Sequence, residues 1–183
     1  MNAEPFYQLT QDFFDHAKTI DPSTVPIDDH VRAMCEQNAC GYFGRSWTCP
    51  PAIDSLDKLR LQLSNYNRLM VVDKVYALES SFDWEGMVAG VKDFQTRILK
   101  LKKKIESLAP DLRFLTLGAG ACQLCKHCSY PEQQPCKHPE DAIFSVEAYG
   151  IDVMKMMAEN GMSYNNGQNT VTYVGGIFWQ TDS

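Results

Sequence analysis

The alternation of hydrophobic and polar residues predicts a long helix flanked by two strands in the middle of the chain. From Trp84 to Leu108, apolar residues recur at steps of four and three, which places them along one face of an α-helix. Pro110 follows this pattern and ends the helix. Residues 68–80 and 113–118 are dense in β-branched and other apolar side chains, which predicts one strand before the helix and one after it.

The N-terminal part of the chain has helical periodicity in three places. An amphipathic helix is predicted over residues 1–20, a second short helix is predicted to begin near Asp28, and a third covers about 52–66. Prolines and turn-forming residues in 21–30 predict a loop between the first two helices. The segment 35–51 combines cysteines with glycines and a Pro-Pro pair, so an irregular loop is expected there.

The C-terminal part is predicted to contain one helix and one hairpin. Pro139 and its acidic neighbours indicate a helix from 139 to about 160, continuous or broken near Gly150, which Gly161 would terminate. Residues 163–179 predict a hairpin whose turn lies at Asn166–Gly167 and whose second strand is long. The order of elements predicts an α/β (α+β) fold, with a small mixed sheet covered by helices and two cysteine-rich metal-binding loops.

Length and charge narrow the class of protein. The 183 residues are expected to form a single domain, 1–183. A net charge of −6 argues against a nucleic-acid partner, because phosphate binding needs an excess of basic residues. No stretch approaches the roughly 20 apolar residues that span a bilayer, and the N-terminus lacks the basic start of a signal peptide. A cytoplasmic protein without a membrane partner is therefore expected, in which the seven cysteines are ligands or catalysts rather than disulfides.

The strongest chemical signal is a run of closely spaced cysteines late in the chain. Cys122, Cys125 and Cys128 have the spacing C-x2-C-x2-C, and Cys136 follows after seven residues. This spacing suits three corners of an iron–sulfur cube with the fourth thiol farther along, and it favours a [4Fe–4S] cluster. Zinc is the main alternative, because four thiolates also bind Zn²⁺, although such sites usually combine two C-x2-C pairs. Free or redox-active thiols are the third interpretation.

A second group of cysteines lies earlier in the chain. Cys35, Cys40 and Cys49 have the spacing C-x4-C-x8-C and precede a Pro-Pro pair. Three thiols would hold a second cluster through three irons and leave the fourth iron open as a Lewis acid. Alternatively, these cysteines are buried apolar residues, or they share one site with the later group. A shared site would leave several thiols without a role, since one cube takes only four ligands.

Other residues near the cysteines are weaker candidates. His127 and His138 flank predicted ligands and are alternatives for one of them, although solvent-facing positions are expected. Glu147 is a candidate acid or base for which a surface or helix-terminal position is expected instead. Trp47, between two predicted ligands, is expected to be a hydrophobic cover over a cluster.

The chain resembles the family of predicted metal-binding proteins called domain of unknown function 2284, which is common in anaerobic bacteria and archaea. The resemblance rests on MCEQNACGYFGRSWTCPP, ALESSFDWEG, LGAGACQLCKHCSYPEQQPCKHPEDAIFSVEAYGIDV and NGQNTVTYVGGIF, which span most of residues 34–178. All seven cysteines stand where the pattern of the family has them. The resemblance implies metal or iron–sulfur binding by an intracellular protein of an anaerobe and favours a functional role for the earlier cysteine group. The resemblance does not imply any particular reaction.

Three functions from different classes fit these observations. An electron-transfer protein would cycle one or two [4Fe–4S] clusters and dock a redox partner protein. A cluster-dependent enzyme would use an open iron on the three-cysteine group for non-redox or sulfur-handling chemistry. A zinc-stabilised structural or regulatory module is the third. Electron transfer is preferred, because a carrier needs no acid–base residues and none is evident in the sequence.

Overall fold

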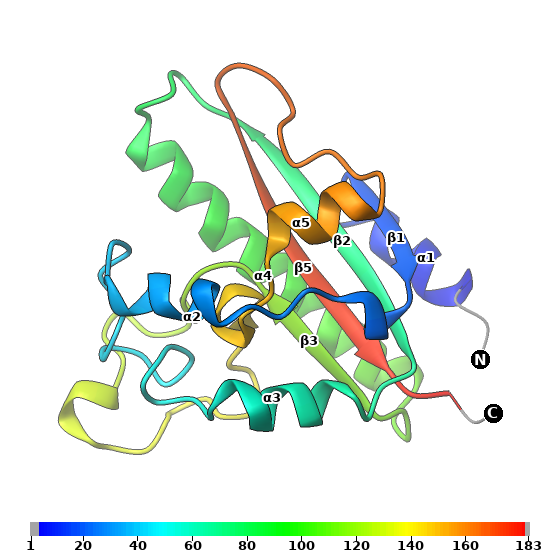
Figure 1. Ribbon diagram of the computed structural model, residues 1–183, viewed down its shortest axis with the longest axis horizontal. Coiled ribbons are helices and arrows are strands. Elements are labelled where there is room, and N and C mark those ends of the chain that lie inside the picture. Colours follow the sequence, from blue (N-terminus) through cyan, green and yellow to red (C-terminus); the bar gives the residue numbers. More distant parts are fainter. Residues whose placement is uncertain (1–3, 182–183) are drawn as a thin grey trace.

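Five strands form one mixed sheet at the centre of the computed structural model, which describes residues 4–181 (Figure 1). The strands are β1 (His16–Ile20), β2 (Arg68–Ala77), β3 (Phe114–Gly118), β4 (Phe144–Ser145) and β5 (Thr170–Trp179). Their order across the sheet is β1-β2-β5-β3-β4, and all neighbours are antiparallel except β3 and β4. The central strand, β5, is therefore paired along one edge with β2 and along the other with β3.

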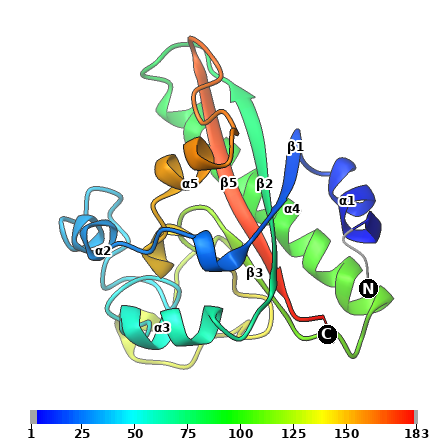
Figure 2. The ribbon, with the colours of Figure 1, turned by 45° about the vertical axis from the view of Figure 1, so that its right-hand side comes forward.

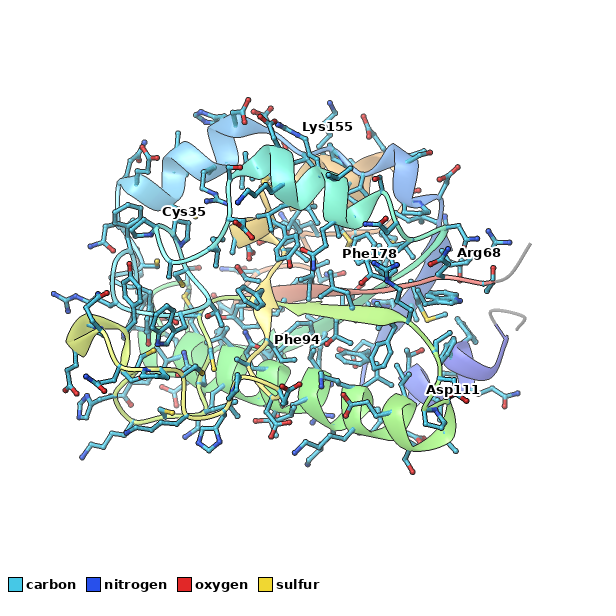
Figure 3. The ribbon with its side chains drawn as sticks, turned by 90° about the horizontal axis from the view of Figure 1, so that it is seen from below. Cys35, Arg68, Phe94, Asp111, Lys155 and Phe178 are labelled. Atoms are coloured by element: carbon cyan, nitrogen blue, oxygen red, sulfur yellow. The ribbon has the colours of Figure 1, made fainter. Side chains whose placement is uncertain are left out.

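Helices cover both faces of the sheet, so the molecule has three layers (Figure 2). On one face lie α4 (Trp84–Leu108) and α1 (Glu4–Gln11), and on the other lie α3 (Leu56–Leu63) and α5 (Val153–Glu159). Phe94 and Phe178 mark the two cores on opposite sides of the sheet (Figure 3). The predicted fold, a small mixed sheet covered by helices, is confirmed.

The sequence of β2 is a continuous apolar run rather than an alternating one, because both faces of the strand are buried. Leu69 and Val71 pack into the core under α3 and α5, whereas Met70 and Val72 pack into the core under α4. A strand buried on both faces carries apolar residues at successive positions. Each face of β2 thus contributes to a separate hydrophobic core.

The long helix α4 has the bounds that its periodicity predicts. Phe94, Ile98 and Leu101 belong to a stripe that is fully buried against the sheet. Asp83 caps the N-terminus, since its side chain accepts a hydrogen bond of 2.8 Å from the backbone N–H of Gly86. The cap and the apolar stripe together determine where this helix begins and which face it buries.

Several other elements agree with their predictions. Helix α2 (Asp29–Glu36) begins after Asp28, whose side chain accepts a hydrogen bond from the His30 N–H. Helix α3 is present but shorter than predicted. Residues 37–55 contain no regular element, as expected for the first cysteine-rich loop. Both cysteine-rich loops are therefore present, and metal binding by them stays a prediction.

The helix predicted over residues 1–20 is wrong in its second half. Only α1 is helical there, and His16–Ile20 form β1 at the edge of the sheet. The pairing begins at Asp15, whose N–H donates to the Asp73 carbonyl at 2.9 Å. Backbone hydrogen bonds to β2 therefore outweigh the helical spacing of the local apolar residues. Residues 1–3 of that prediction lie outside the described residues.

The helix predicted over 139–160 is also wrong in its first half, whereas the alternative of a break near Gly150 is confirmed. Residues 144–145 form β4 beside β3, and η3 (Glu147–Tyr149) is a single 3₁₀ turn. The Val146 N–H donates to the Gly118 carbonyl at 2.9 Å, which ties this segment to the sheet. Gly150, with φ of +73°, then turns the chain into α5. Gly161 follows the end of α5 with φ of +63°, as predicted for a C-terminal glycine.

The predicted C-terminal hairpin is not formed. The long strand exists as β5, but its partners are β2 and β3 rather than the segment just before it. Residues 163–167 instead make a local turn in which the Asn166 side chain donates to the Ser163 carbonyl and the Thr172 hydroxyl. Both edges of β5 are occupied, so no edge is left for a hairpin partner.

Among residues 4–181, no helix combines the length and the hydropathy that a membrane-spanning segment needs.

Candidate metal centre

The two cysteine-rich loops lie side by side at the end of the molecule opposite the termini (Figures 1 and 3). The first loop, 37–55, follows α2, and the second, 119–143, follows β3 and contains only the 3₁₀ turn η2 (Tyr130–Glu132). Cys35, labelled in Figure 3, marks the same end of the molecule. The fold thus brings together segments that are far apart in the sequence.

The later cysteines share one small cavity. Its volume is about 20 Å³, and part of its wall comes from the first loop, including Trp47 and Thr48. The predicted ligands on this wall are Cys122, Cys125, Cys128 and Cys136. Their spacing in the sequence therefore corresponds to a common position in space. His138 lines the same cavity, and both His138 and His127 are exposed to solvent.

The start of the later loop is attached to α4. The Gln95 side-chain amide, which is buried, donates to the carbonyls of Ala119 and Gly120 at 2.8 and 3.1 Å. Backbone carbonyls at the end of a strand need such partners when the ladder stops. Gln95 therefore positions the chain immediately before Cys122.

Trp47 and Thr48 attach the first loop to the later one. The Thr48 hydroxyl accepts a hydrogen bond of 3.1 Å from the Cys122 N–H. The Trp47 indole N–H donates to the Gln134 carbonyl at 3.0 Å, and its ring packs edge-on against Tyr130 with centroids 4.9 Å apart. Trp47 therefore packs on the later loop, and its role as a hydrophobic cover over a cluster stays a prediction.

We expect Thr48→Val to lower the free energy of unfolding by about 1 kcal/mol, because it leaves the partly buried Cys122 N–H without its acceptor. Valine has nearly the same shape as threonine, so packing is preserved. Thr48→Ser keeps the hydroxyl and is the matched control. Denaturant titration of anaerobically prepared protein measures the difference, and equal stability of the valine and serine variants would contradict the assignment.

The earlier cysteines line a second and much larger cavity. Cys35 lies in the last turn of α2, and Cys40 and Cys49 lie in the loop that follows. All three contribute to the wall of a cavity of about 400 Å³. Cys40 is exposed to solvent, whereas Cys35 and Cys49 are partly buried. The structure therefore separates the seven cysteines into the same two groups as the sequence does.

Tight turns bring Cys40 and Cys49 to the same cavity. The Asn38 side chain accepts a hydrogen bond of 3.0 Å from the Phe43 N–H. Gly44 adopts a φ of +68°, and its N–H donates to the Pro50 carbonyl at 2.9 Å. The loop closes on itself across this last hydrogen bond, which shortens the path between the two thiols.

Burial raises the pKa of three of the cysteine thiols. It raises the pKa of Cys49 to about 11, and the nearby Cys40 thiol adds to the rise. The hydroxyls of Thr48 and Ser46 oppose it in part. Burial likewise raises the pKa of Cys35 and of Cys122. Because a thiol ligates metal as its thiolate, binding at either group must release protons.

The donor atoms match a metal centre in kind, but they are not gathered around a point. Within residues 4–181, no three or more His, Cys, Asp or Glu side chains converge closely enough to hold one metal ion. Thiols are the ligands of both zinc sites and iron–sulfur clusters. The two cavities therefore have the chemistry of a sulfur-ligated centre and thiols spread more widely than a single ion requires.

Glu147 is the functional candidate whose environment the sequence did not reveal. It belongs to the wall of the large cavity, and its Oε2 atom is enclosed without a hydrogen-bond partner in the described part of the chain. Burial raises the pKa of its carboxyl group, opposed in part by its own N–H, the Ser145 hydroxyl and the Gly120 N–H. A surface or helix-terminal position was expected for this residue. Glu147 lies in the first turn of η3 and is only partly buried, in agreement with that expectation, but its Oε2 atom is enclosed.

Two further residues of the site were not identified from the sequence. Gln95 and Thr48 act through hydrogen bonds to the later loop, which is distant in the chain from both of them. Ser46 supports Thr48 through a hydroxyl–hydroxyl contact of 3.1 Å within the first loop.

Comparison with known proteins gives one match. The model of the family described as "Predicted metal-binding protein (DUF2284)" matches residues 18–179. No curated protein and no solved structure matches the chain. The matched range contains both cysteine groups and every strand of the sheet except the first two residues of β1.

Proposed function

Because the chain belongs to this family of predicted metal-binding proteins, we propose that it is a two-centre iron–sulfur protein that transfers electrons to a redox partner protein. The observation that carries the proposal is the partition of the seven thiols into two adjacent cavities, one with four and one with three. A [4Fe–4S] cluster would be held by Cys122, Cys125, Cys128 and Cys136, and a second by Cys35, Cys40 and Cys49. Such clusters supply one-electron transfer when bound.

The spacing of the later cysteines in the sequence supports an iron–sulfur cluster over zinc. Three cysteines follow one another as C-x2-C-x2-C and the fourth stands alone, which suits a [4Fe–4S] cluster. Four-thiolate zinc sites usually combine two C-x2-C pairs instead.

Two residues of the first loop support electron transfer: Thr48 connects the two cysteine groups, and Trp47 packs over the later group. Thr48 accepts from the Cys122 N–H, and its hydroxyl faces the Cys49 thiol, so one side chain touches both cysteine groups. Trp47 shields the later group from water, and a drier site changes the reduction potential of a bound cluster. Cys40 is exposed, so the earlier group lies at a surface that a partner protein can approach.

A second candidate function is catalysis at the earlier group, and the large cavity favours it. Three thiols leave one position of a four-iron cluster without a cysteine ligand. In this protein that position would face a cavity of about 400 Å³ that also holds the Glu147 carboxyl group. A pure electron carrier needs no such space beside its cluster.

The metal content of protein purified without oxygen tests the proposal. We expect about eight irons and about eight acid-labile sulfides per chain, with a broad visible absorbance that is bleached by dithionite. Two one-electron steps should appear in a redox titration. The same preparation should reduce a protein or dye acceptor in amounts that match its cluster content.

The other outcomes separate the alternatives. Eight irons with an exchangeable iron and no transfer to any acceptor would favour catalysis over electron transfer. One or two zinc ions in a colourless protein would overturn the iron–sulfur proposal and support a structural or regulatory module.

A further inference from the structure

A group of large apolar side chains lies exposed at the N-terminal end of α4 and on the loop before β5. Phe82, Trp84, Val88 and Tyr164 are 93%, 66%, 43% and 40% exposed, and we call them the aromatic patch. In the described part of the chain, Phe82 and Trp84 belong to neither of the two hydrophobic cores. Folding therefore does not explain such large side chains at these positions, and an exposed apolar group of this kind marks an interaction site.

The aromatic patch adjoins the earlier cysteine group. Trp84, Val88 and Tyr164 line the same cavity as Cys40, which is the exposed thiol of that group. Phe82 is not part of the cavity wall and belongs to the loop that joins β2 to α4. A protein seated on the patch would therefore lie beside the cavity that contains Cys40.

Hydrogen bonds hold the loop between β2 and α4 in one conformation. The Asp83 side chain accepts from the Gly86 N–H at 2.8 Å and from the Glu79 N–H at 3.0 Å, so it ties the loop to the start of the helix. The Leu78 N–H donates to the Asn169 carbonyl at 2.8 Å, which attaches the same loop to the segment before β5. A surface that is already ordered loses little conformational entropy when a partner binds.

The charges around the aromatic patch are acidic. Residues 79–91 contain Glu79, Asp83 and Glu85 and no lysine, arginine or histidine. The side chains of Glu79 and Glu85 are exposed. Residues 33–44 and 156–169, which include the other parts of the cavity rim, also lack basic residues. Since charge complementarity around an apolar centre selects a partner, this surface matches a protein with lysine or arginine around an apolar contact.

A second copy of this chain is a poorer match than a basic protein. In a symmetric dimer, a patch that meets itself places the same residues of both copies opposite each other. Glu79 and Glu85 would then face like charges, which costs free energy. The net charge of −6 adds a general repulsion between two copies.

We propose that the aromatic patch, together with Glu79 and Glu85, is a docking surface for a basic protein that presents lysine or arginine side chains around an apolar centre. Docking itself requires only the exposed residues of this surface. That the docked protein accepts electrons rests on the proposed function, because the adjacent cavity contains Cys40.

A matched pair of probes tests the charge complementarity. Mitochondrial cytochrome c presents lysines around its exposed haem edge, and acetylated cytochrome c has the same fold without these charges. At low ionic strength we expect anaerobically purified protein to bind cytochrome c at least about tenfold more tightly than the acetylated form, measured by calorimetry. Added salt should weaken this binding, because it screens exposed charges. Equal binding of the two probes would overturn the proposal.

Paired variants at the two ends of the molecule show where the probe binds. Phe82→Ser should weaken binding of cytochrome c about tenfold, because aromatic side chains carry much of the binding energy of an interface. Leu108→Ser removes an exposed apolar side chain at the other end of α4 and should leave binding within about twofold. Glu85→Gln should weaken binding about threefold at low salt. Asp111→Asn makes the same change in net charge at the end opposite Cys35 (Figure 3) and should leave binding unchanged. Equal effects within each pair would show that only net charge attracts the probe and would overturn the proposal.

Metal analysis and sedimentation of the same samples separate the other outcomes. Binding with this pattern of variants in a protein that contains zinc or no metal would support the docking surface and contradict the proposed iron–sulfur function. A protein with two clusters that reduces a dye but does not bind cytochrome c would keep the proposed function and overturn the docking surface. A dimer that Phe82→Ser dissociates would assign the patch to a second copy and would also overturn the proposal.

Discussion

Replacement of Cys125 by serine is expected to remove the [4Fe–4S] cluster of the later group and about four irons per chain. Serine is a poor ligand for such a cluster, and the remaining thiols are spread around a cavity rather than gathered at one point. Replacement of Cys49 by serine should instead remove the second centre and leave the first. Iron, sulfide and visible absorbance of anaerobically purified variants measure both effects.

The control for this prediction is the neighbouring position. Lys126 is exposed and adjacent to Cys125, so Lys126→Ser should retain the full iron content. If Cys125→Ser and Cys49→Ser each lost all iron, the two groups would form one shared site rather than two centres. If neither variant lost iron, the cysteine groups would not be the ligands.

The second large effect is expected from Gly175→Ala in the central strand. A Cβ atom at Gly175 would lie 2.6 Å from the Leu117 carbonyl oxygen and 2.9 Å from an Ile98 methyl group. The carbonyl belongs to the backbone of β3 and cannot move without breaking the ladder. We expect the free energy of unfolding to fall by about 3 kcal/mol, at the upper end for overpacked cores.

Gly176→Ala is the matched control for this substitution. The nearest atom to its added Cβ would be a Leu69 methyl group at 3.1 Å, which a side-chain rotation can displace. We therefore expect a loss of less than about 1 kcal/mol. Denaturant titration of both variants measures the difference, and a smaller loss at Gly175 than at Gly176 would show that β3 is not held against β5 as described.

The elements that the sequence predicted well are those whose stability is local or whose burial is uniform. Helix α4 is long, capped by Asp83 and apolar along one face, so its periodicity alone identifies it. Strand β2 is buried on both sides and is correspondingly apolar throughout. The segment His16–Ile20 and the short strand β4 were missed, because hydrogen bonds to distant strands stabilise them. Local periodicity contains no information on such pairing.

In the candidate site, too, the sequence predicts what is local and misses what depends on contacts between distant segments. Cysteine spacing divides the thiols correctly into two groups, because neighbouring ligands on one loop are a local property. The hydrogen bond from Cys122 to Thr48 joins residues 74 positions apart, and no local pattern predicts it. Glu147 was expected at the surface or at a helix terminus and lies in the first turn of η3, but the enclosure of its Oε2 atom depends on contacts that no local pattern predicts.

The place of β5 in the sheet has a consequence for how the protein is made. Both cysteine segments precede β5 in the chain, yet β5 is the strand that joins β2 to β3 and so connects the two halves of the sheet. A ribosome therefore releases every thiol before the support for the two loops can form. The two loops therefore reach the arrangement described above only after β5 has joined β2 and β3 in one sheet.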